Sequence, residues 1–148
     1  MTAGKRFLAS EATKEEIAAK VKECLESRQE ICFAQFHGSF LGSGPFRDVD
    51  IAVYLEPGYV GLSEPSDRFD YEASLEDLIE RRVGVPVDVR VLNDAPLAFC
   101  YGVLKNGCPV LVRNPQLRCD FQTRILDMYF DFAPFRSRYL REVLGREA

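Results

Sequence analysis

Apolar and polar residues alternate along this chain in two periods, one typical of helices and the other of strands. In residues 13–27 the apolar positions recur every three or four residues, which predicts an amphipathic helix. Thr13 and Glu16 have the spacing of a capping box, so we expect Thr13 to be the N-cap of this helix. Four short apolar runs have the length of strands. They span residues 30–36, 49–55, 85–92 and 109–112.

The segments between these strands predict further helices and two loops that contain glycine and proline. Asp94 and Pro96 are typical of an N-cap and of a first helical turn. The helices are expected over 67–82, 94–105 and 115–144, and irregular loops over 38–47 and 57–66. This order predicts one domain of the α/β (α+β) class, spanning 1–148, with a mixed sheet of about four strands flanked by helices. Its core would cover 13–113, followed by a long C-terminal helical segment, 115–144.

Three aspartates lie at the beginnings of the second and third predicted strands. Asp48 and Asp50 are two residues apart, so in a strand their side chains point to the same face. Asp88 lies on the third strand, which a helix joins to the second, and such a connection permits parallel pairing. We therefore expect Asp50 and Asp88 at the same edge of the sheet. Converging carboxylates repel one another unless a cation lies between them, and a pair of Mg²⁺ ions is a common solution in phosphoryl chemistry.

The alternative is that these aspartates are surface residues on half-buried strands. Aspartate is disfavoured in strand interiors, however, and the preceding turn Gly38-Ser39 is a second requirement that the chain meets. Such a turn frees backbone N–H groups to bind phosphate oxygens. Donors for a polyphosphate beside ligands for Mg²⁺ predict nucleotidyl transfer. Other phosphate motifs do not fit, because a strand follows the glycine-rich segment and no Gly-Lys-Ser/Thr sequence occurs.

Composition narrows the classes of function. Of the 148 residues, 47% are hydrophobic and 28% charged, as in ordinary globular proteins, and the net charge of −4 argues against a dedicated nucleic-acid-binding protein. No apolar run has the length or position of a signal peptide or a membrane span. The five cysteines lack the CxxC spacing of a metal site. We therefore expect free thiols, a cytoplasmic location and no membrane partner.

The Gly-Ser pair, the spacer, the Asp-x-Asp and the later aspartate together resemble the signature of the DNA polymerase β-like nucleotidyltransferase superfamily. The likeness is greatest to its minimal nucleotidyltransferases, a group that includes antitoxins. The matching positions are Gly38, Ser39, Asp48, Asp50 and Asp88. Two features depart from that group's pattern: the spacer is shorter than usual, and Arg47 stands where serine is common.

This resemblance implies a polymerase-β-like fold and a role for each matched residue. An NTP, with ATP as the expected substrate, would be bound through Mg²⁺, and its nucleoside monophosphate transferred to a hydroxyl with release of pyrophosphate. Asp48 and Asp50 would hold both ions, and Asp88 would join them at the catalytic ion. Gly38 and Ser39 would bind the nucleotide, with the Ser39 hydroxyl and nearby N–H groups steadying the β- and γ-phosphates.

The resemblance also implies a partner, a small all-helical protein of the HEPN-like toxin kind, which the chain would adenylylate as an antitoxin. Two alternatives stay open: an aminoglycoside-like enzyme acting on a small molecule, and a non-catalytic module that only binds its partner. An apolar stripe on the C-terminal segment is either core or the contact surface for a partner or a second copy of the chain. It comprises Phe121, Ile125, Met128, Tyr129, Phe132, Phe135, Tyr139, Leu140 and Val143.

Three further side chains near these motifs allow two interpretations each. His37 precedes the Gly-Ser turn, and we favour a structural or hydrogen-bonding role over general-base catalysis. Arg90 shares a face with Asp88 and would either offset its charge or contact the nucleotide. Arg47 would either contact a phosphate or lie solvated in its loop, which we favour.

Overall fold

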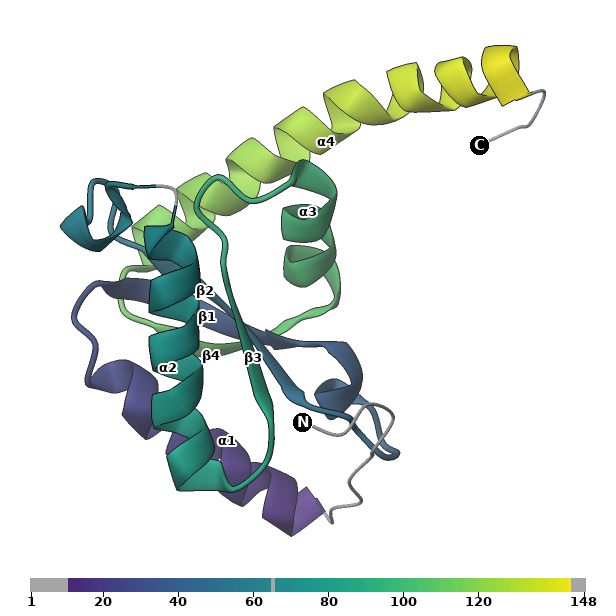
Figure 1. The fold of residues 1–148 in the computed structure, drawn as a ribbon. Helices are drawn as coiled ribbons and strands as arrows, with labels where there is room; N and C mark the ends of the chain where they lie inside the picture. Colours follow the sequence, from purple (N-terminus) through teal and green to yellow (C-terminus); the bar gives the residue numbers. More distant parts are fainter. Residues whose placement is uncertain (1–10, 65, 145–148) are drawn as a thin grey trace.

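The computed structural model describes residues 11–64 and 66–144, and its elements follow the predicted order (Figure 1). The helices and strands are α1 (Glu11–Glu26), β1 (Ile31–His37), β2 (Val49–Leu55), α2 (Asp67–Val83), β3 (Val87–Val91), α3 (Leu97–Asn106), β4 (Cys108–Val112) and α4 (Pro115–Leu144). Two short 3₁₀ helices, η1 (Gly38–Leu41) and η2 (Val60–Leu62), lie in the loops after β1 and β2.

The strands form one mixed sheet, as expected, and their order in it is β3-β2-β1-β4. The parallel pair is β2 with β3, whereas β1 runs antiparallel to both β2 and β4. Helices α1 and α2 pack on one face of the sheet and α3 and α4 on the other (Figure 1). The predicted fold class is confirmed.

The alternation of β2 sends its side chains into two different cores. Val49, Ile51 and Val53 are fully buried in the core beneath α1 and α2. Ala52 and Tyr54, on the same face as the aspartates, are buried against α3 and α4. The two helices therefore cover the second half of the face on which the aspartates lie. Only the beginning of the strand, where the carboxylates lie, is open.

Three glutamates of α2 accept hydrogen bonds from the backbone N–H groups on the outer edge of β3. Glu80, Glu76 and Glu72 accept hydrogen bonds from the backbone N–H groups of residues 87, 89 and 91, at 2.9, 2.8 and 2.9 Å. The glutamates recur once per turn of α2, and the N–H groups that face them recur at every second residue of β3. Each glutamate therefore lies opposite one N–H group. Unpaired N–H groups on an edge strand invite association with another chain. The carboxylates block that pairing at this edge.

Two predicted helix starts are wrong. The first helix begins at Glu11, so Thr13 lies inside α1 rather than at an N-cap, since Glu11 and Ala12 are good helix formers that extend the helix backward. The third helix begins at Leu97 after Pro96, and Asp94 adopts a left-handed φ of 59° in the preceding turn. The ring of Pro96 disfavours helical geometry at Ala95, so Asp94 cannot start the helix.

The C-terminal segment is one long helix, α4, whose far end extends beyond α3 (Figure 1). Of the predicted apolar stripe, Phe121 and Ile125 are core residues, Met128 is 48% exposed, and Tyr129 stacks on Tyr101 with ring centroids 3.7 Å apart. The other stripe residues lie outside the described side chains: Phe132, Phe135, Tyr139, Leu140 and Val143. None of the described helices has the length and apolar composition that a membrane span requires.

Candidate metal and nucleotide site

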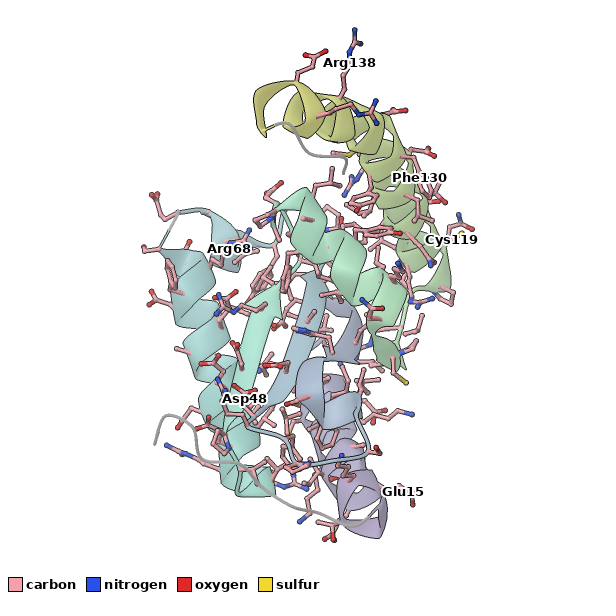
Figure 2. The ribbon with its side chains drawn as sticks, turned by 90° about the vertical axis from the view of Figure 1, so that its right-hand side faces the viewer. Glu15, Asp48, Arg68, Cys119, Phe130 and Arg138 are labelled. Atoms are coloured by element: carbon pink, nitrogen blue, oxygen red, sulfur yellow. The ribbon has the colours of Figure 1, made fainter. Side chains whose placement is uncertain are left out.

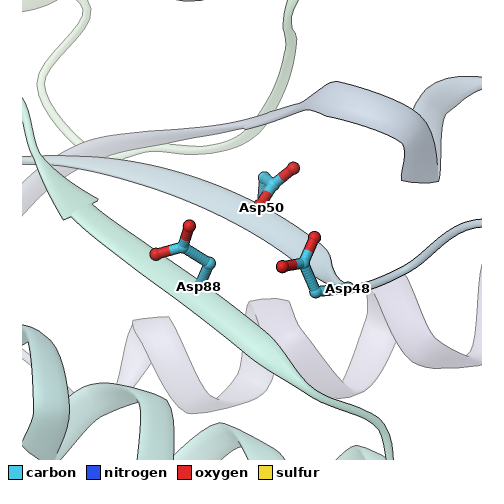
Figure 3. Close-up of side chains that lie close together, drawn as sticks. All are labelled: Asp48, Asp50 and Asp88. Carbon is cyan, nitrogen blue, oxygen red and sulfur yellow. The ribbon is translucent and has the colours of Figure 1, made fainter. Parts of the chain in front are cut away.

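Three carboxylates meet where β2 and β3 begin (Figure 3). Asp50 pairs directly with Asp88 in the parallel register, and Asp48 lies one residue before β2. Each residue offers a carboxylate oxygen, and these oxygens lie within 4.8 Å of one another. The prediction that parallel strands would bring Asp50 and Asp88 together is confirmed. All three side chains are half-buried, so a ligand can still reach them.

The crowding of negative charge is most severe at Asp50. Burial, followed by the charge of Asp48 and a hydrogen bond with it, raises the pKa of Asp50 to about 7; Asp88 adds to the effect and Arg90 opposes it. Carboxylates held this close have their ionised forms disfavoured until a cation offsets the repulsion. Three hard oxygen donors on one open face are the ligands that Mg²⁺ prefers. The residues present therefore fit a divalent cation.

Arg90 provides a partial counter-charge within the protein itself. Its Nε lies 3.1 Å from Oδ1 of Asp88, and 55% of the arginine side chain is exposed. Of the two interpretations of Arg90, this ion pair supports the one in which it offsets the charge of Asp88. Asp48 and Asp50 form no ion pair with a cationic side chain among the described residues.

Gly38 lies against Asp50 at the end of β1, where His37 pairs with Asp50 across the antiparallel ladder. Gly38 has a left-handed φ of 75°, and a Cβ at this position would collide with the Asp50 carboxylate. Only glycine accommodates both constraints. The chain then turns through η1. This short helix was not expected in the loop 38–47, but a 3₁₀ helix needs only a few residues, and η1 has four.

Ser39 and Arg47 bracket the loop between the turn and the aspartates. The backbone N–H of Arg47 donates to the Ser39 hydroxyl at 3.4 Å, which ties the residue before Asp48 back to the turn. The N–H of Gly42 also donates to the Ser39 carbonyl at 3.0 Å. The side chains of Ser39 and Arg47 are exposed, in keeping with the favoured solvated position of Arg47.

His37 lies in the same cavity as the carboxylates. Its ring packs edge-on against Phe99 with centroids 5.6 Å apart, and its buried Nε2 has no hydrogen-bond partner among the described residues. Burial lowers the pKa of His37 below its ordinary value, although the charges of Asp88 and Asp48 raise it in part. The packing against Phe99 supports a structural role for this histidine.

A cavity of about 610 Å³ opens over Asp50 and Asp88. Its other walls come from α2, through Arg68 and Phe69, and from α3, through Phe99. In Figure 2, Asp48 lies near the beginning of the strands, and Arg68 lies far from it, in the first turn of α2. The volume lies in the ordinary range for small-molecule and cofactor sites. Sequence patterns did not indicate Arg68, Phe69 or Phe99, because each comes from a helix with no motif of its own.

Lys14 is a fourth residue near the site that was not predicted from the sequence. It is only 7% exposed, and its Nζ donates to the carbonyls of Phe40, Gly42 and Gly44, at 3.3, 2.6 and 3.4 Å. A signal was present: Lys14 precedes Ile17 and Val21 at intervals of three and four residues, and so continues the buried stripe of α1.

The model of the family described as "Polymerase beta, Nucleotidyltransferase" matches residues 19–116, which include all three aspartates. A search of curated proteins finds no significant match.

Several solved structures share the fold. One is a complex of tri-AMPylated HEPN toxin with MNT antitoxin from Shewanella oneidensis, at 18% identity and a TM-score of 0.66, covering 88% of this chain and 98% of that one. Another is the toxin–antitoxin complex MntA–HepT, at 18% identity and 0.65, covering 88% and 98%. A third is a toxin–antitoxin structure with AMP-PNP, at 19% identity and 0.67, covering 86% and 98%. At these identities the likeness establishes the fold.

Proposed function

We propose that this chain, which belongs to the polymerase beta nucleotidyltransferase family, transfers AMP from ATP to a hydroxyl group of a small all-helical partner protein and acts as an antitoxin. The observation that carries the proposal is the cluster of Asp48, Asp50 and Asp88, with oxygens within 4.8 Å of one another beside the turn at Gly38. Nucleotidyl transfer uses such a cluster to gather an anionic substrate at cations.

The roles of the residues follow from their positions. Asp48, Asp50 and Asp88 would hold Mg²⁺, which when bound supplies charge neutralisation at the phosphates and lowers the pKa of the acceptor hydroxyl. The Ser39 hydroxyl and the N–H groups of η1 would bind the β- and γ-phosphates, since they lie on the loop next to the carboxylates. Arg90 holds Asp88 on the cavity side of β3 through its ion pair.

The reaction forms one bond and breaks one. The acceptor oxygen attacks the α-phosphorus, the bond between that phosphorus and the α–β bridging oxygen breaks, and pyrophosphate leaves while the hydroxyl proton passes to solvent. The cavity over Asp50 and Asp88 offers aromatic walls at Phe69 and Phe99 and a volume of about 610 Å³, which suits a nucleotide. We place the reaction in the cytoplasm and treat the chain as one nucleotidyltransferase domain.

The partner assignment is supported by the solved structures of similar fold. They include an MNT antitoxin with an AMPylated HEPN toxin, and a toxin–antitoxin structure with AMP-PNP. On this chain we propose α4 as the contact surface, where Met128 and Phe130 are 48% and 61% exposed. The two side chains are two positions apart on the helix and so lie on different faces of it, but each is a large apolar group open to a partner.

The test is transfer of label from α-³²P-NTPs. The purified protein is incubated with Mg²⁺, each of the four NTPs in turn and a lysate of its source, and labelled proteins are identified by mass. We expect label from ATP on one small protein, which gains the mass of one or more AMP groups, and none with the double variant Asp48→Asn/Asp50→Asn. Label transfer that the double variant retains, or none from any NTP, would overturn the enzymatic proposal. Binding of the partner by an inactive protein would instead favour the non-catalytic module.

A further inference from the structure

Lys14 is a cation buried beneath the loop that joins Gly38 to Asp48. Its ammonium group donates three hydrogen bonds to backbone carbonyls of this loop, and no carboxylate forms an ion pair with it among the described residues. The ammonium group also lies 5.7 and 5.5 Å from the ring centroids of Phe40 and Phe46. Burying a charged group costs free energy unless its hydrogen bonds are made, and here the loop makes them.

Phe40 and Phe46 are buried in the core on either side of the tip of this loop, and the Arg47 N–H donates to the Ser39 hydroxyl. The tip itself, residues 41–45, is exposed, and its Gly42 N–H donates to the Ser39 carbonyl. Loops with few buried contacts and few internal hydrogen bonds open readily. The bonds from Lys14 to Phe40, Gly42 and Gly44 therefore account for much of what holds the tip of the loop in this conformation.

The direction of these bonds determines where the loop's N–H groups face. In a trans peptide the C=O and the following N–H point in opposite directions, and the described residues contain no cis peptide. Drawing the carbonyls of Phe40 and Gly42 toward Lys14 therefore turns the N–H groups of Leu41 and Ser43 away from it. Outward N–H groups on a turn form a site for anionic oxygens, and the buried positive charge below strengthens it.

We propose that Lys14 is a positioning residue for the nucleotide: it holds the loop 38–44 in the conformation that binds the triphosphate, without touching the reacting atoms. This inference rests on the proposed function and adds to it a residue from α1, outside the signature motifs. Lys14 acts before chemistry, so its removal weakens nucleotide binding and leaves the turnover of bound ATP almost unchanged.

The test compares Lys14→Met with Lys20→Met. Methionine preserves most of the apolar stem at either position, but Lys20 is half-exposed on the same helix, and its ion pair among the described residues is with Glu16, at 3.3 Å. We expect Lys14→Met to raise the Kd for AMP-PNP with Mg²⁺, and the KM for ATP, about 10- to 100-fold with kcat within about threefold. Lys20→Met should match the wild type. Binding of Mn²⁺ alone, which reports on the aspartates, should be the same in all three proteins.

A merely structural role would lower the melting temperature of Lys14→Met and leave its Kd for AMP-PNP unchanged in the folded protein, and that result would overturn the inference. If Lys14→Met does not fold, Lys14→Gln replaces it, with the same expectation and the same contrary result. A wild-type protein that fails to bind AMP-PNP would refute the proposed function itself. Wild-type binding with unaltered affinity in the variant refutes only the role of Lys14.

Discussion

Gly38 and Asp50 lie so close together that no side chain fits between them. A Cβ built on Gly38 would collide with Oδ2 of Asp50 and would lie 3.1 Å from its Cγ. The backbone of Gly38 also has a left-handed φ of 75°. The glycine of the turn is therefore a steric requirement of the carboxylate cluster, in addition to any contact that its N–H makes with a phosphate.

Gly38→Ala should displace the Asp50 carboxylate and strain the turn. Because displacements of about 1 Å at reacting groups can cost about 100-fold in rate, we expect kcat/KM to fall at least about 100-fold. Gly44→Ala is the matched control in the same loop, since a Cβ there has nothing within 4 Å and its φ is not left-handed. Equal activities of the two variants in the label-transfer assay would show that the contact with Asp50 is irrelevant.

The metal-free protein should be less stable at neutral pH than in mild acid because of Asp50. Its pKa is about 7 in the folded protein, well above the ordinary value of 3.8. At a pH between these two pKa values, the folded protein keeps a proton on Asp50 that the unfolded chain has released. The stability that this proton contributes is therefore complete below about pH 4 and is lost as the pH rises through 7.

Asp50→Asn should remove this dependence. In EDTA we expect it to raise the free energy of unfolding by about 1 kcal/mol at pH 8, after allowance for the half-exposed side chain, and to have little effect at pH 4. Asp77→Asn, on the exposed face of α2, should show no such pH dependence. Urea titrations at the two pH values measure both variants, and a gain for Asp50→Asn that is equal at pH 4 and pH 8 would contradict the raised pKa.

Glu76 should stabilise the protein through its hydrogen bond rather than through its charge. Its carboxylate accepts from the Val89 N–H at 2.8 Å, yet burial raises the pKa of Glu76. Glu76→Ala leaves that N–H without its partner and should cost about 1–3 kcal/mol. Glu76→Gln keeps an acceptor oxygen and should cost much less.

Hydrogen exchange at the Val89 amide measures this directly, and should be faster in Glu76→Ala than in wild type or Glu76→Gln. The exposed neighbour Asp77 offers a control: Asp77→Ala breaks only its surface pair with Arg81 and should change stability by about 0.5 kcal/mol or less. Unchanged exchange at Val89 in Glu76→Ala would mean that the helix carboxylate does not protect the strand edge.

His37→Phe should keep the protein active. A phenyl ring preserves the contact with Phe99 and removes a buried nitrogen that has no hydrogen-bond partner among the described residues. General bases contribute about 10²- to 10⁴-fold, so a fall in kcat of less than about tenfold would agree with a structural role. The pH–rate profile should keep its shape. Loss of a titration between pH 5 and 7, with a fall of 100-fold or more, would make His37 the base.

The parts of the structure that could be predicted from the sequence are those encoded by local periodicity. Alternation in residues 49–55 correctly separated Asp48 and Asp50 from Val49 and Ile51, and the intervening helix indicated that β2 and β3 run parallel. The meeting of Asp50 and Asp88 follows from these two facts together. The coarse order of helices and strands was predicted for the same reason.

The parts that were not predicted depend on contacts between segments distant in the sequence. The bond of Glu76 to Val89 has no local signature, because glutamate is also common on exposed helix faces. The spacing of Lys14 indicates its burial but not the carbonyls of the loop to which it donates. The covering of Ala52 and Tyr54 by α3 and α4 likewise depends on tertiary packing. Asp94 was misassigned because the restriction that Pro96 places on Ala95 outweighed its capping tendency.

The most direct test of the account is a crystal structure with Mn²⁺ and AMP-PNP, using the anomalous signal of manganese to locate the ions. We expect manganese bound by carboxylate oxygens of Asp48, Asp50 and Asp88, with the triphosphate against the loop that follows Gly38. Manganese elsewhere, or Asp88 turned away from the ions with the nucleotide outside the cavity, would contradict it.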